Sequence, residues 1–130
     1  MIVSILKNSL FLFVFVGLTG FTSVKQNPIT ITIQTPFENS SVKMGDTVFI
    51  KASISADAPL HDISIKVKTA DNTIIAYAEN IHTHDNKLDI SKSYIQTIKY
   101  KTELILEISS RDHSGNIIAT SSRKFYSDKK

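Results

Sequence analysis

After Pro28, apolar and polar side chains alternate almost one by one along the chain, and this period of two constrains the fold more than any other feature. The clearest example is the run over residues 48–55, in which Val48, Ile50, Ala52 and Ile54 alternate with polar or aromatic neighbours. Successive residues of a β-strand point to opposite faces, so this spacing indicates strands with one buried face. No helical spacing follows residue 28, and we therefore predict an all-β domain.

Seven such runs are separated by turn-forming residues. They cover residues 29–34, 48–54, 63–67, 74–78, 88–98, 104–108 and 117–125, and the stretch 38–46 is interpreted as turn only. Gly45-Asp46 and Asp71-Asn72 are typical of tight turns, and Pro59 interrupts a strand because it donates no backbone hydrogen bond. Strands of this length and spacing predict a single seven-stranded antiparallel immunoglobulin-like sandwich over residues 28–126, in preference to a small barrel or an eight-stranded jelly roll.

The first 23 residues have the order of a secretory signal peptide. Lys7 precedes an apolar run from Leu10 to Leu18, and small residues follow it. The alternative is a short uncleaved membrane anchor, but the run is shorter than the ~20 residues that a spanning helix needs. Phe21 stands where an acylated lipoprotein cysteine would be, and the chain has no cysteine. We therefore expect export to the periplasm, the cell surface or the medium, without disulfides.

Several turn motifs together resemble bacterial immunoglobulin-like and fibronectin-III-like modules of exported proteins. These are Gly45-Asp46 before an alternating strand, the Asp57 loop with Leu60, and Asp112-x-x-Gly115-Asn116 before the last strand. The disulfide and core tryptophan of antibody domains are missing. The resemblance implies a β-sandwich and a functional class of adhesion, surface display or carbohydrate-associated binding, and it implies no catalytic residues.

All four histidines lie in connections between the expected strands. Because successive antiparallel strands alternate in direction, the second, fourth and sixth connections of a seven-stranded sandwich open at the same end. The histidines of these three connections are, in chain order, His61, then His82 with His84, then His113. Residues two apart in an extended segment point the same way, so His82 and His84 are expected to offer two imidazoles to one ion.

A third imidazole, from His61 or His113, and the Asp85 carboxylate would complete a set suited to zinc or copper. Asp62, Asp85 and Asp112 are alternatively expected to orient the rings by hydrogen bonds. Two other interpretations stay open. The histidines are polar residues in polar loops, or the same end binds calcium through Asp57, Asp62 and Asp112. No EF-hand loop is present, and single aspartates commonly form turns.

Catalysis is not expected, because the sequence has no Gly-x-Ser-x-Gly elbow and no His-Glu-x-x-His helix. The basic residues at 123–130 are interpreted as a solvated terminus rather than a nucleic-acid site. Our leading hypothesis is a non-enzymatic adhesion module of the bacterial cell envelope that binds a protein or glycan through a sheet edge or its end loops. The alternative is a periplasmic or secreted zinc- or copper-binding protein. A membrane contact is expected only through an uncleaved signal segment.

Overall fold

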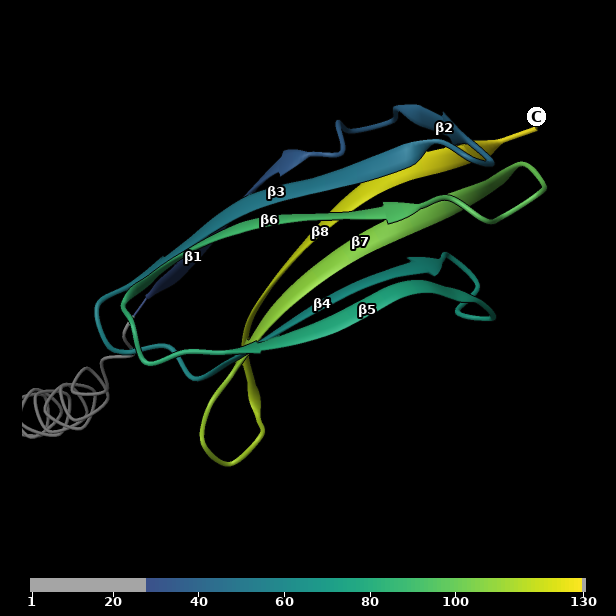
Figure 1. The fold of residues 1–130 in the computed structure, drawn as a ribbon. Coiled ribbons are helices and arrows are strands. Elements are labelled where there is room, and N and C mark those ends of the chain that lie inside the picture. Colours follow the sequence, from purple (N-terminus) through teal and green to yellow (C-terminus); the bar gives the residue numbers. More distant parts are fainter. Residues whose placement is uncertain (1–27, 130) are drawn as a thin grey trace, which may run out of the picture.

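The computed structural model describes residues 28–129, which form two β-sheets packed face to face (Figure 1). The eight strands are β1 (Ile29–Thr35), β2 (Ser41–Lys43), β3 (Thr47–Ala56), β4 (Asp62–Thr69), β5 (Ile75–His82), β6 (Lys87–Ile95), β7 (Thr102–Arg111) and β8 (Ile117–Asp128). These residues contain no helix, which confirms the all-β prediction. Accordingly, no helix that could cross a membrane occurs among them. The expected signal segment, residues 1–23, lies outside the described residues.

The first sheet has three strands in the order β1-β3-β6, and the second has five in the order β2-β8-β7-β4-β5. All pairs are antiparallel except β2 with β8, which run parallel. The prediction of a seven-stranded, wholly antiparallel sandwich is therefore wrong in strand number and in one pairing. The extra strand β2 has only three residues, too few for alternation to appear, and it exists through its pairing with Tyr126, Ser127 and Asp128.

Alternation along each strand places one row of apolar side chains between the two sheets. On β3 the row is the one expected from the sequence, Val48, Ile50, Ala52 and Ile54, and each of these residues is buried. The facing row comes from the second sheet and consists of Ile63, Ile65, Val67, Leu104, Leu106, Ile108 and Phe125. Burying one such side chain fully stabilises a fold by about 1.5–3 kcal/mol, so this layer supplies the main driving force for the sandwich.

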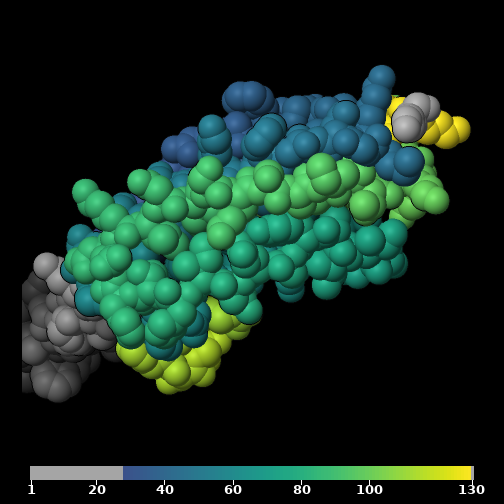
Figure 2. All heavy atoms as spheres, in the orientation of Figure 1, coloured from purple at the N-terminus to yellow at the C-terminus, as the bar shows by residue number. Residues whose placement is uncertain are grey.

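Polar contacts close the two long sides of the sandwich. On one side Lys92 of β6 lies 3.3 Å from Glu79 of β5, and the rings of Tyr77 and Tyr94 are 5.4 Å apart. The side chains of β5 and β6 form a continuous surface there, in teal and green (Figure 2). On the other side the Arg123 guanidinium donates hydrogen bonds to the carbonyls of Ile33 and Pro36. With both long sides covered in this way, the loops lie at the two ends of the sandwich.

The β3–β4, β5–β6 and β7–β8 connections lie at the same end of the sandwich, opposite the end at which β8 finishes (Figure 1). These connections carry His61, His84 and His113, and His82 is the last residue of β5, where the β5–β6 connection begins. Two of the connections are joined by backbone hydrogen bonds: the Leu60 N–H donates to the Asp85 carbonyl, and the Thr83 N–H donates to the His61 carbonyl, each at 2.9 Å. The fold thus fixes the position of one histidine loop relative to the next.

Candidate metal centre

The four histidines converge at this end of the sandwich, which we call the histidine pole and define by His61, His82, His84 and His113. His61 precedes β4, His82 is the last residue of β5, His84 follows it, and His113 lies between β7 and β8. Ring centroids are 4.6 Å apart for His61 and His82, and 4.7 Å apart for His82 and His84. The convergence expected from alternating strand direction is present in the structure.

Three of these residues have the geometry of a metal-ligand set. His61, His82 and His84 each offer one ring nitrogen, and the three nitrogens lie within 4.8 Å of one another. The Nε2 atoms of His82 and His84 are 3.2 Å apart. Two nitrogens bound to the same tetrahedral zinc are about 3.4 Å apart, given a bond length of about 2.1 Å. The pair is therefore already near chelating distance, and the third ring needs a small adjustment.

His113 occupies a different position in the cluster. Its ring packs on that of His61, with centroids 3.9 Å apart and planes inclined by 36°. It is exposed to solvent and is not one of the three residues whose ligand atoms converge. We therefore assign His113 to packing against His61 rather than to the ligand set.

The carboxylate that contacts the imidazoles is that of Asp62. His82 Nδ1 lies 2.8 Å from Asp62 Oδ1, and His61 Nε2 lies 3.4 Å from Asp62 Oδ2. Asp62 and His82 are directly opposite each other in the β4–β5 pairing, so their side chains share one face of the sheet.

The predicted ligand Asp85 is placed differently. Its backbone N–H donates to Thr83 Oγ1, and its carbonyl accepts from Leu60. Within residues 28–129 its carboxylate makes no hydrogen bond or ion pair with an imidazole. Asp85 lies beyond the end of β5. Its backbone carbonyl bonds to Leu60 and so connects the β5–β6 loop with the β3–β4 loop. Of the three acids that the sequence named for orienting the rings, Asp62 is the one that contacts His82 and His61.

The hydrogen bond from His82 holds the pKa of the Asp62 carboxyl below its ordinary value; desolvation opposes this shift, and the nearby rings of His61, His82 and His113 reinforce it. Asp62 is therefore ionised at neutral pH and accepts a hydrogen bond from the Nδ1–H group of His82. A neutral imidazole with its proton on Nδ1 has its lone pair on Nε2. The Asp62 contact thus directs a free lone pair of His82 toward His84, which is how a carboxylate orients a metal-binding histidine.

His61 adds a further sign that the site accepts another group. Its Nδ1 atom is buried and has no hydrogen-bond partner among residues 28–129. Buried polar atoms without partners are uncommon in native proteins. This ring therefore retains hydrogen-bonding or ligand capacity that the surrounding side chains do not use.

The calcium alternative fits the structure less well than a nitrogen-liganded ion. Asp112 Oδ1 accepts hydrogen bonds from the backbone N–H groups of Ser114 and Asn116, and so stabilises its own turn. Asp62 is engaged by His82. The donor atoms that converge at the pole are imidazole nitrogens, which suit zinc and copper better than calcium.

No protein-family model and no curated protein matches this chain. Among solved structures it is similar to a Niemann-Pick type C2 protein from Japanese carpenter ant, with a TM-score of 0.50 and 8% identity over 78% of this chain and 89% of that one.

Two further structures are more distant. The sporulation control protein Spo0M from Bacillus subtilis has a TM-score of 0.49 and 7% identity over 82% of this chain and 51% of that one. A late embryogenesis abundant protein has a TM-score of 0.44 and 14% identity over 96% and 82%. At such low identity the likeness to the carpenter ant protein concerns the fold alone, and it places this chain among all-β proteins built from two packed sheets.

Proposed function

We propose that this protein is an exported immunoglobulin-like module that binds a transition metal ion, zinc or copper, at the histidine pole. The observation that carries the proposal is the 3.2 Å separation of the His82 and His84 Nε2 atoms, with a His61 nitrogen within 4.8 Å and Asp62 bonded to the far side of the His82 ring. Imidazole nitrogen is a preferred ligand of both metals. Three ligands leave one tetrahedral position for water or for another molecule.

The arrangement supports metal binding over the alternative of unrelated polar loop residues. Polar residues in loops need not meet, whereas His61 and His82 are far apart in sequence and their ring centroids are 4.6 Å apart. Closely packed imidazoles repel one another when protonated. A bound metal ion is coordinated by the neutral rings and attracts all of them. Metal binding therefore gives a reason for the histidines to be clustered.

The strand order supports the immunoglobulin-like assignment. Leaving out the short β2, the sheets read first-second-fifth and seventh-sixth-third-fourth in chain order. A constant-type immunoglobulin domain places its fourth strand beside the fifth. Here the fourth strand, β5, pairs with the third, β4. We therefore propose that this fold is related to the constant-type immunoglobulin sandwich, with the fourth strand, β5, in the other sheet.

Calorimetric titration of the purified protein with Zn²⁺ and Cu²⁺ tests the metal proposal. We expect micromolar or tighter binding of one ion, lost in the double variant His82→Ala, His84→Ala. The matched control is His113→Ala, which removes an exposed imidazole outside the ligand set and is expected to retain binding. Absence of heat with both metals, or equal loss in the control, contradicts the proposal.

A second candidate function is that of an adhesion module for a protein or glycan of the cell envelope, and the edge strand β5 favours it. Among residues 28–129, β5 pairs only with β4. It contains no proline, and Ile75 at its start is 58% exposed. An exposed edge of this kind accepts an additional strand from a partner. Binding to purified envelope proteins and glycans, measured by surface plasmon resonance, should weaken in Ile75→Lys. Equal binding by the variant and the native protein contradicts this function.

A further inference from the structure

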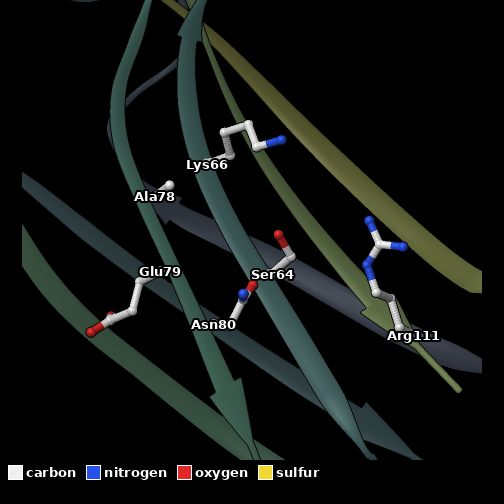
Figure 3. A pocket seen from close by; sticks show the side chains of 6 residues that line it. All are labelled: Ser64, Lys66, Ala78, Glu79, Asn80 and Arg111. Carbon is white, nitrogen blue, oxygen red and sulfur yellow. The ribbon is translucent and has the colours of Figure 1, made fainter. Parts of the chain in front are cut away.

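Beside the histidine pole, the outer face of the five-stranded sheet contains an open hollow of about 500 Å³. Its lining consists of Ser64, Lys66, Ala78, Glu79, Asn80 and Arg111 (Figure 3). We call this site the polar hollow. Its residues come from β4, from β5 and from the last position of β7. Small-ligand sites in proteins have volumes of about 300–1,000 Å³, so the hollow has room for a small molecule or for one end of a larger one.

The strand register explains why Ser64, Lys66, Ala78 and Asn80 share one face. Ser64 lies opposite Asn80, and Lys66 lies opposite Ala78, in the β4–β5 pairing. Side chains of directly opposed residues point to the same side of a sheet. Ala78 is exposed and has the shortest side chain of the lining, so the floor beside Lys66 stays open.

The hollow is positively charged because its only acid is already engaged. Glu79 lies 3.3 Å from Lys92 and accepts a hydrogen bond from the Tyr77 hydroxyl, and its side chain points away from Lys66 and Arg111 (Figure 3). Lys66 has no ion-pair partner among residues 28–129. Glu107, which lies opposite Lys66 on β7, pairs instead with Lys68 at 3.7 Å.

Arg111 supplies the second charge. One guanidinium nitrogen donates to the Gly115 carbonyl at 2.9 Å, which leaves most of the five guanidinium N–H donors unused by that bond. Figure 3 shows Ser64 next to Lys66 along β4, with the Arg111 side chain to one side of them on β7. A guanidinium, an ammonium, a hydroxyl and the Asn80 amide together form a set of donors that matches the oxygens of an anion.

We propose that the polar hollow binds the carboxylate or phosphate group of a small ligand, and that a metal ion at the histidine pole strengthens this binding. The second part rests on the proposed function. Asp62 connects the two sites, because it lies opposite His82 on one side and opposite Arg111 on the other. Ser64 and Asn80 lie two residues further along their strands, which is about 7 Å. A cation at the pole would therefore attract an anion in the hollow.

Titration of the metal-free, ¹⁵N-labelled protein with acetate and, separately, with inorganic phosphate tests the first part by NMR. We expect saturable shifts of the Ser64, Lys66 and Asn80 amides with at least one of the two anions, and the stronger one identifies the group. Lys66→Gln should weaken binding about tenfold, the effect of one charge-assisted hydrogen bond.

Lys51→Gln is the matched control, because it removes the same charge from an exposed position of β3 in the other sheet and should change the affinity less than about twofold. Ala78→Leu, which fills the hollow without changing its charge, should abolish the shifts. Equal effects of the two lysine substitutions, or no saturable shift with either anion, would overturn the inference.

Repeating the acetate titration with one equivalent of Zn²⁺ tests the second part. We expect severalfold tighter acetate binding that Lys66→Gln reduces. If zinc binds and the acetate affinity is unchanged, the linkage is wrong and the metal site stands. If the enhancement is the same in Lys66→Gln, the anion sits on the metal and the hollow is not its site. If zinc does not bind, the same titration is made with Cu²⁺. If neither metal binds, the proposed function and the linkage both fail, and the metal-free titration alone decides the hollow.

Discussion

Asp62 has the central position at the histidine pole, because its side chain lies between His82 and His61 and its strand position lies between those of His82 and Arg111. It sets the tautomer of His82 and thereby the direction of the lone pair. Carboxylates in this position are known to contribute to metal affinity without touching the ion. Asp62 is therefore a positioning residue, and its effect should be measurable apart from that of the ligands.

Asp62→Ala should weaken zinc binding by about 10–100-fold, the usual effect of removing such a carboxylate. The reason is that His82 then loses the acceptor that keeps its proton on Nδ1. Calorimetric titration measures the change, and Asp89→Ala is the control, because Asp89 is an exposed acid on β6 in the other sheet. Unchanged zinc affinity in Asp62→Ala, or an equal decrease in the control, would show that the carboxylate does not position His82.

The sequence predicts that the histidines meet and names Asp62, Asp85 and Asp112 as carboxylates that orient the rings. It does not single out Asp62, because the pairing of Asp62 with His82 depends on a bulge. The β4–β5 register shifts between Val67 and Lys68. Counted back from the turn without that shift, Asp62 would lie opposite Ile81, and His82 would lie opposite His61. A one-residue slip moves every side chain to the other face, and bulges leave little trace in a single sequence.

The β4–β5 hairpin shows how a turn residue supports the element that carries the site. Asp71 Oδ1 accepts hydrogen bonds from the hydroxyls of Thr69 and Thr73, at 2.6 and 2.8 Å, and from the Thr73 N–H. The Thr69 hydrogen bond, followed by the two from Thr73, lowers the pKa of the Asp71 carboxyl from its ordinary value. Asn72 adopts a positive φ of 64° in the same turn, a conformation that asparagine tolerates better than most residues.

The lowered pKa of Asp71 predicts a stability difference that depends on pH. A carboxyl whose pKa is lower in the folded state stabilises that state above its unfolded value of 3.8, and the contribution is lost as the pH falls through the folded value. Asp71→Asn should therefore lower the urea midpoint at neutral pH. The difference from the native protein should shrink when the measurement is repeated at a pH well below 3.8, where the native carboxyl becomes protonated. A difference of equal size at both pH values would show that the ionised form is not what matters.

Element boundaries depart from the prediction where backbone groups bond across loops. The run 88–98 was predicted as one strand, whereas β6 ends at Ile95. There the Gln96 N–H donates to the Asp46 carbonyl, and the Gly45 N–H donates to the Gln96 carbonyl. Ile98 is buried beyond the strand end, which is why its apolar character extended the predicted strand. The alternation of apolar and polar residues identifies the buried face of a strand. It does not show where the backbone stops pairing with the neighbouring strand.

At the scale of the whole molecule, the histidine pole follows from chain direction alone. Each antiparallel crossing reverses the chain, so the three connections meet at one end whichever sheet each strand joins. The extra strand β2 lies in the β1–β3 connection, outside the three histidine loops, and so leaves this relation intact. The prediction of the pole therefore did not depend on the strand count, which was wrong. The pairing of β5 with β4 determines only which acid contacts the histidines and which residues form the hollow next to the histidine pole.

Because the proposed ligands come from the β3–β4 and β5–β6 sides of the pole, a bound ion should stabilise the entire sandwich. A ligand that binds only the folded state at 100 times its Kd adds about 2.7 kcal/mol. In a domain of this size that corresponds to a rise in Tm of roughly 10 °C or more. Thermal unfolding followed by circular dichroism, with Zn²⁺ and with a chelator, measures the rise.

The double variant His82→Ala, His84→Ala should show the same Tm under both conditions, while His113→Ala should keep the rise. The Tm is the informative quantity, because an ion held by an unfolded or local segment would add heat in calorimetry without stabilising the fold. Binding to the folded state alone must shift the unfolding equilibrium. If zinc binds tightly and the Tm of the native protein does not change, the three imidazoles do not bind the zinc ion jointly in the folded protein.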